Sequence, residues 1–153
     1  MPIPAYRRRG MTLLELLAVV TLMGIFAAVA MARFGRSVFA DFGAEADARK
    51  IGLAMLQAKR RAITTGSNHG VTLRPTSGAA TSFTVDNIES GATVDGPYPL
   101  AATVTSTASP MTFAFDGSAQ APYVVTLQGP NRKWQISVVP INGTIQTTDI
   151  TPH

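Results

Sequence analysis

An uninterrupted apolar run near the N-terminus constrains this chain more than any other feature. The run follows three consecutive arginines, Arg7 to Arg9, and a glycine, Gly10, and residues 16–32 carry no charged side chain. A membrane-spanning helix needs about 20 predominantly apolar residues, whereas the apolar core of a signal peptide has only about 7–15. Arginines that precede such a helix remain on the cytoplasmic side. The sequence therefore predicts a single membrane-spanning helix with its N-terminus in the cytoplasm.

Glu15 is the only carboxylate within this apolar segment. A charged side chain in the middle of a membrane helix costs about 2.5–3.5 kcal/mol on insertion scales, and such residues usually have a partner and a function. Residues 12–32 contain no basic side chain, and Arg33 lies a full helix length from Glu15. We therefore expect the partner of Glu15 to come from another molecule.

The residues Gly10-Met11-Thr12-Leu13-Leu14-Glu15 resemble the N-terminal signal of type IV pilins and type II secretion pseudopilins. The resemblance implies that a prepilin peptidase cleaves the Gly10–Met11 bond and that the new N-terminus, Met11, is methylated. It also implies that Glu15 pairs with the N-terminal amine of a neighbouring subunit during filament assembly. Met11 stands where phenylalanine is commonest in the family. The alternative is a plain N-terminal membrane anchor that carries a stray acid.

The basic character of the chain belongs largely to its first ten residues. The formal net charge is +4, but without Arg7 to Arg9 the basic side chains fall from 13 to 10, against 9 acidic ones. The charge therefore does not predict a nucleic-acid-binding surface. The chain has no cysteine, which excludes zinc–thiolate sites and cysteine catalysis.

Residues 34–66 are predicted to continue the helix as an amphipathic half. One face is expected to hold the apolar residues that recur at three- and four-residue steps, and these are Phe39, Phe42, Ala46, Ile51, Met55, Ala58 and Ala62. The remaining faces are expected to hold the charged residues Asp41, Glu45, Asp47, Arg49, Lys50 and Lys59. The cluster Lys59-Arg60-Arg61, followed by Gly66, is typical of a helix C-terminus, where cations face the negative end of the helix dipole.

After Gly66 the sequence alternates like β-strands. The predicted strands are 70–74, 82–85, 103–105, 111–115, 123–128, 134–139 and 144–147, and residues 76–110 are otherwise expected to form a variable loop region. Asn142-Gly143 predicts a tight hairpin turn, and Asp116-Gly117 predicts a turn.

A long N-terminal helix packed on a C-terminal antiparallel sheet resembles the pilin fold, an α+β class. The predicted organisation is a leader at residues 1–10, a membrane and assembly half-helix at 11–33, an amphipathic half-helix at 34–66 and a periplasmic β-domain at 67–153.

Residues 50–147 resemble the GspH/FimT family, in the helix end before Gly66 and in the later strands and turn glycines. GspH-type members are minor pseudopilins of type II secretion, and FimT-type members are minor pilins tied to DNA uptake with an arginine-rich tail. Residues 144–153 contain no arginine. The resemblance therefore implies a GspH-like subunit that supports protein secretion across the outer membrane, with a FimT-like minor type IV pilin as the alternative.

The expected partners are a prepilin peptidase, other pseudopilins or pilins and the inner membrane, and not nucleic acid. No enzymatic activity, cofactor or metal is expected. His69 and His153 have no spaced carboxylates around them, so neither predicts a metal site or a catalytic role. The acids Asp86, Glu89 and Asp95 could bind calcium, but they are better explained as solvated loop acids because no cage of six or more oxygens is visible in their spacing.

Overall fold

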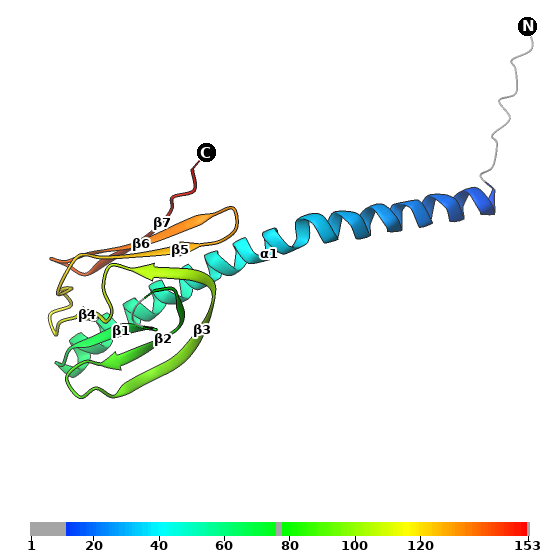
Figure 1. Cartoon of the computed structure of the whole chain (residues 1–153). Helices are drawn as coiled ribbons and strands as arrows, with labels where there is room; N and C mark the ends of the chain where they lie inside the picture. The colour runs from blue at the N-terminus through cyan, green and yellow to red at the C-terminus, as the bar shows by residue number, and fades with distance from the viewer. Residues whose placement is uncertain (1–11, 76–77, 153) are drawn as a thin grey trace, which may run out of the picture. The chain divides into compact units, whose positions relative to one another are not determined.

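The computed structural model describes residues 12–75 and 78–152. The chain forms two compact units that divide between Arg36 and Ser37. One helix, α1 (Leu13–Thr65), runs through both units, and the second unit adds a sheet of seven strands. Each unit is described below by itself (Figure 1).

The seven strands form one antiparallel sheet in the order β4-β1-β2-β3-β5-β6-β7. Their bounds are β1 (His69–Arg74), β2 (Ala80–Asn87), β3 (Thr93–Ser106), β4 (Met111–Phe113), β5 (Tyr123–Gln128), β6 (Lys133–Val139) and β7 (Thr144–Asp149). An apolar N-terminal helix followed by an antiparallel sheet confirms the predicted α+β class.

The prediction that residues 76–110 form mainly a variable loop is wrong. Eight residues of this region form β2 and fourteen form β3, the longest strand of the sheet. Most side chains of β3 are exposed or half-buried, so the strand lacks the apolar alternation by which a half-buried strand is recognised. Backbone pairing with β2 and β5, rather than burial of its own side chains, defines β3.

The strand β3 changes partners along its length. Its first part pairs with β2, as at Tyr98 with Phe83, and residues 103–106 pair with β5, as at Thr105 with Thr126. Val104 pairs with both neighbours, with Ala80 of β2 and with Leu127 of β5. The register between β2 and β3 also shifts at several points. The sheet therefore consists of two halves that share this one strand.

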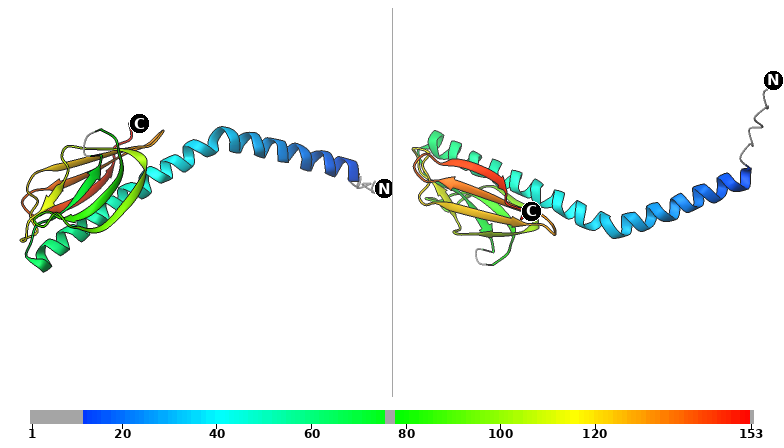
Figure 2. Two further views of the ribbon diagram at one scale, coloured as in Figure 1. Left: turned by 60° about the horizontal axis from the view of Figure 1, so that its bottom comes forward. Right: turned by 90° about the horizontal axis from the view of Figure 1, so that it is seen from above.

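Within the second unit, the sheet covers one side of α1 (Figure 2). The covered side of the helix is a stripe of small and medium side chains at steps of three and four residues, namely Ala44, Ala48, Ile51, Met55, Ala58 and Ala62. Alanines dominate this stripe, which lets the sheet approach the helix backbone closely. The large side chains of the core come from the sheet, and Phe83, Phe113, Met111 and Leu127 are among them.

This packing corrects part of the predicted helix face. Ile51, Met55, Ala58 and Ala62 are buried as predicted, but Phe42 and Ala46 are exposed. Asp47 was expected on the polar face and is instead only 1% exposed. The side chain of Phe39 lies outside the described residues.

Candidate assembly site

The first part of α1 exposes its apolar side chains on all sides. Leu13–Arg33 is long and apolar enough to cross a membrane, with a mean hydropathy of 2.4 over its most apolar stretch, and none of that stretch is buried. Glu15 stands near the start of this segment beside Leu13, which is 85% exposed, and Leu14, which is 77% exposed. A helix that is apolar all round and unburied requires lipid or other helices as its surroundings.

Thr12 and Glu15 occupy the start of the helix. The backbone N–H of Glu15 donates to Oγ1 of Thr12 at 3.3 Å, and the N–H of Leu16 donates to the carbonyl oxygen of Thr12 at 3.1 Å. Thr12 is thus the N-cap, and Glu15 takes the third helical position, where an acid is favoured by the positive end of the helix dipole. The sequence reasoning missed this local role, although the spacing Thr-x-x-Glu is its signature.

Glu15 forms no ion pair within residues 12–75 and 78–152. Its carboxylate is exposed and surrounded by apolar side chains. The predicted cleavage site, Gly10 and Met11, lies outside the described residues. The arrangement can therefore accept, at the first turn of α1, a cation that lies outside the described residues.

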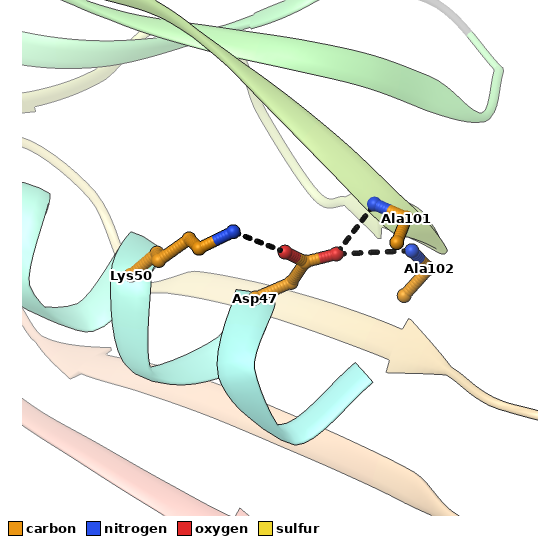
Figure 3. A network of polar contacts seen from close by, with 4 residues as sticks. All are labelled: Asp47, Lys50, Ala101 and Ala102. Atoms are coloured by element: carbon orange, nitrogen blue, oxygen red, sulfur yellow. Dashed lines mark hydrogen bonds and ion pairs between the residues drawn. The ribbon is translucent and has the colours of Figure 1, made fainter. Parts of the chain in front are cut away.

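In the second unit, a buried carboxylate joins the helix to the point where β3 changes partners. Oδ2 of Asp47 accepts hydrogen bonds from the backbone N–H groups of Ala101, at 2.6 Å, and Ala102, at 3.0 Å. Its other oxygen lies 3.2 Å from Nζ of Lys50 (Figure 3). Ala101 and Ala102 lie just before the residues of β3 that pair with β5. Asp47 thus satisfies backbone donors at the junction of the two sheet halves.

A second helix carboxylate binds the turn between β5 and β6. Asp41 accepts hydrogen bonds from the backbone N–H groups of Asn131, at 2.9 Å, and Arg132, at 3.2 Å, and from Nδ2 of Asn131 at 2.9 Å. These hydrogen bonds, led by the one from the Asn131 backbone, hold the pKa of the Asp41 carboxyl below its usual value. A Cβ at Gly129 would lie 2.7 Å from Oδ1 of Asp41, so a larger residue there would displace the Asp41 carboxylate.

A lysine near the end of α1 binds the turn between β6 and β7. Nζ of Lys59 donates to the carbonyl oxygens of Asn142, at 2.7 Å, and Gly143, at 3.3 Å. The predicted role of Lys59 as a cation at the helix C-terminus is therefore wrong, because its ammonium group is used in a contact with the sheet. The last turn of α1 contains no basic residue.

The predicted turns at Gly143 and Gly117 pack against each other. Gly143 has φ +57° and Gly117 has φ +83°, conformations that favour glycine. A Cβ at Gly143 would lie 2.2 Å from the carbonyl oxygen of Gly117, and a Cβ at Gly117 would lie 2.9 Å from Cδ1 of Ile63. The turn at Asp116-Gly117 is confirmed, and a hairpin is present at Gly143, but its loop is residues 140–143 rather than the tight Asn142-Gly143 turn that was predicted. The two glycines permit a close backbone contact beside the end of the helix.

The candidate histidine and calcium residues have protein partners of their own. His69 begins β1, is buried, and its Nδ1 lies 2.9 Å from the carbonyl oxygen of Ser67. Asp86 is a buried residue of β2 that accepts from the Thr84 hydroxyl at 3.0 Å, and is not a solvated loop acid. Glu89 accepts from the backbone N–H of Asn68 at 3.0 Å. His153 lies outside the described residues.

Asp95 lies in β3 rather than in a loop, and it contacts both the helix and its own strand. It accepts hydrogen bonds from the Tyr98 hydroxyl at 2.6 Å and from Nε2 of Gln57 at 3.0 Å. The hydrogen bond from Tyr98 is the main cause that lowers the pKa of Asp95, and the same bond raises the pKa of Tyr98. Within the described part of the chain, no three His, Cys, Asp or Glu side chains come together as metal ligands would.

Comparisons with known proteins agree with these observations. The family model of the prokaryotic N-terminal methylation motif matches residues 6–31, which include Gly10, Met11 and Glu15. No curated protein shows a significant sequence match to the chain.

Two solved structures share the fold. The type IV minor pilin FimU of Pseudomonas aeruginosa is 11% identical with a TM-score of 0.57, over 68% of this chain and 91% of FimU. The minor pseudopilin EpsH from the type 2 secretion system of Vibrio cholerae is 16% identical with a TM-score of 0.55, over 69% of this chain and 96% of EpsH. The chain therefore combines a prepilin-type N-terminal methylation motif with a pilin-like fold, the two features of the type IV pilin and pseudopilin superfamily.

Proposed function

We propose that this chain is a GspH-like minor pseudopilin of a type II secretion pseudopilus. The precursor is held in the inner membrane by residues 11–33, with its N-terminus in the cytoplasm and its β-domain in the periplasm. A prepilin peptidase cleaves between Gly10 and Met11, Met11 is methylated, and the helix then moves from lipid into the filament. The protein has a structural role, with other pseudopilins as its partners.

One observation carries the proposal: Glu15, at the start of an exposed apolar helix and within a matched methylation motif, has no cationic partner among residues 12–75 and 78–152. Cleavage after Gly10 creates a new amine, and the same amine on a neighbouring subunit would supply the cation that Glu15 lacks. Because the pair forms away from water, it contributes register between subunits more than net affinity.

A minor type IV pilin is the second candidate. The structural likeness to FimU favours it as much as the likeness to EpsH favours a pseudopilin. The segment after Gly143 argues against the DNA-uptake variant of this candidate, because it contains no arginine to contact phosphates.

Intact mass spectrometry of the protein from its native membrane tests the processing step. The expected chain begins at Met11 and is heavier by one methyl group. A chain that still carries residues 1–10 would contradict the proposal and leave an anchored domain.

Deletion of the gene distinguishes the two machines. Loss of extracellular proteins with intact surface pili supports the secretion pseudopilus, whereas loss of pili with normal secretion supports the minor pilin.

A further inference from the structure

The two edges of the sheet differ in how well they are covered. The edge strand β4 has only three residues, Met111 to Phe113, and all three are buried. Residues that follow β4 cover it, because Phe113 forms a β-bridge with Ala119 and the N–H of Gln120 donates to the carbonyl oxygen of Thr112 at 3.1 Å. This edge cannot accept a further strand.

The opposite edge, β7, lacks the usual protection. Its six residues pair with β6 in an unbroken register, from Thr144 with Val139 to Asp149 with Trp134. Natural edge strands are commonly protected by bulges, prolines, lysines or very short length. The β7 sequence TIQTTD contains no proline or lysine, its single charged residue is Asp149 at the last position, and no described strand pairs with its outer edge. An edge of this length, about 20 Å, is a template for an added strand.

A groove of about 580 Å³ runs between β7 and the exposed side of α1. Leu53 and Leu56 form its helix wall, and Ile145 and Thr147 contribute from the strand. Leu53 is 67% exposed, so the wall is apolar and open. A strand added to β7 would direct alternate side chains towards this wall.

The charged side chains that line the groove are both cations. Arg49 is exposed and forms an ion pair with Glu45 at 2.6 Å. Lys59 donates hydrogen bonds to carbonyl oxygens and has no ion pair among residues 12–75 and 78–152. No described carboxylate lines the groove. A complementary segment is therefore acidic.

We infer that β7 and this groove bind an extended acidic segment of a neighbouring filament subunit, which adds to the sheet as an eighth strand. Main-chain hydrogen bonds to β7 supply affinity, and the apolar wall and the two cations supply specificity. The inference rests on the proposed function, because it takes a filament subunit of a different kind as the occupant.

Hydrogen–deuterium exchange of the full chain tests the inference. Amides of residues 144–148 are compared between assembled filaments and the detergent-solubilised, unassembled chain, and we expect them to exchange about tenfold more slowly in filaments. Unchanged exchange of these amides in filaments that contain the chain would overturn the inference and leave the proposed function intact. Absence of the chain from filaments would instead contradict the proposed function.

Paired substitutions separate the groove from the rest of the helix. Leu53→Asp should abolish the protection of residues 144–148, whereas Phe42→Asp, at a similarly exposed position outside the groove, should not. Arg49→Glu should likewise reduce the protection, whereas Arg60→Glu, an exposed arginine outside the groove, should not. If the two variants of either pair protect residues 144–148 equally, the groove does not bind the added strand and the inference is overturned.

A cross-link identifies the occupant. The chain has no cysteine, so Gln146→Cys introduces a unique thiol on the exposed part of β7, to which a short cross-linker that reacts with carboxylates at its other end can be attached. A cross-link in filaments to an acidic segment of a different subunit supports the inference. A cross-link between two copies of this chain, or none, overturns it.

Discussion

Oδ2 of Asp47 lies 2.6 Å from the backbone nitrogen of Ala101, and this contact joins the helix to the strand that both halves of the sheet share. Asp47 is nearly fully buried, and the same oxygen also accepts from the next backbone N–H. The carboxylate is thus the acceptor for two successive backbone N–H groups, which in a regular β-sheet would donate to carbonyl oxygens of neighbouring strands. The acid supplies an acceptor where the pairing of β3 with β2 is interrupted, between Pro99 and Val104.

Removal of the Asp47 carboxylate should destabilise the domain strongly. Asp47→Ala leaves the N–H groups of exposed Ala101 and half-buried Ala102 without this acceptor, and we expect a loss of about 2 kcal/mol in the free energy of unfolding. Lys50→Ala removes only the half-exposed end of the network and should cost about 0.5 kcal/mol. Urea denaturation of the detergent-solubilised full chain measures both. Equal losses for the two variants would contradict the assigned role of Asp47.

Substitution by alanine should destabilise the domain more at Gly143 than at Gly91, although both glycines have a positive φ. Gly143→Ala places a Cβ 2.2 Å from the carbonyl oxygen of Gly117, whereas Gly91→Ala, at φ +69°, meets nothing within 4 Å. The Gly91 variant should cost about 1 kcal/mol for its left-handed backbone alone. The Gly143 variant should cost about 3 kcal/mol or more, because the backbone must also shift. Thermal melting of the two variants measures the difference. Similar melting temperatures for Gly143→Ala and Gly91→Ala would contradict the close contact between Gly143 and Gly117.

Stability should fall in acid in a way that depends on Asp41. Its folded-state pKa lies below the ordinary value of 3.8, so its contribution is present above that value and is lost as the pH falls through the folded-state pKa. Asp41→Asn should lose some stability near neutral pH and should show a smaller further loss between about pH 5 and pH 3. Asp95 and Asp116 also have lowered pKa values, so part of the acid dependence should persist. An unchanged acid dependence in the variant would contradict the assignment.

Glu15→Ala should leave processing intact and block assembly. The variant keeps the apolar segment and the Gly10–Met11 bond, but it cannot offset the N-terminal charge of a neighbour. Mass spectrometry should show a chain that begins at Met11, and filament fractions should contain little of it. Glu45→Ala, which removes an acid later in the same helix, is the control and should incorporate normally. Normal incorporation of Glu15→Ala would refute the assembly role.

Substitution of Gly10 should prevent cleavage. Gly10→Ala, and more strongly Gly10→Val, adds a side chain at the residue that precedes the scissile bond. The precursor should then retain its full mass in the membrane, while Ala5→Val, further from the bond, should be processed normally. Efficient cleavage of the Gly10→Val chain would argue against the prepilin peptidase.

The sequence predicted the strands better where apolar residues alternate than where they do not. Strand β5 begins and ends where the alternation of residues 123–128 placed it. Strand β3 went largely unpredicted because its side chains are mostly exposed, and its pairing depends on strands that are distant in sequence.

The sequence also placed the buried face of α1 only in part. Hydrophobic periodicity identifies a repeating stripe but gives most weight to large apolar side chains. Because Phe42 was included, the predicted buried face was rotated away from the face that the sheet covers. The alanines at 44, 48, 58 and 62 were the better signal, because close helix–sheet packing selects small side chains.

The candidate assembly residues were accessible to sequence reasoning because they depend on local order along the chain. A cation cluster, a glycine and an acid five residues later require no tertiary contact to be recognised. The roles of Asp41, Asp47 and Lys59 were not accessible, since each contacts a residue at least 50 positions away.

The three polar contacts of α1 also bear on the mechanical stability of the domain under tension. Separate parts of the sheet are hydrogen-bonded to the helix by three side chains, Asp41, Asp47 and Lys59. These residues span roughly 27 Å of helix, at 1.5 Å per residue. Tension applied along the axis of α1 would load these contacts together, in shear, rather than one after another as in peeling. A continuous helix that contacts the sheet at three points would thus transmit force from its apolar first part to the whole sheet without first unfolding one edge.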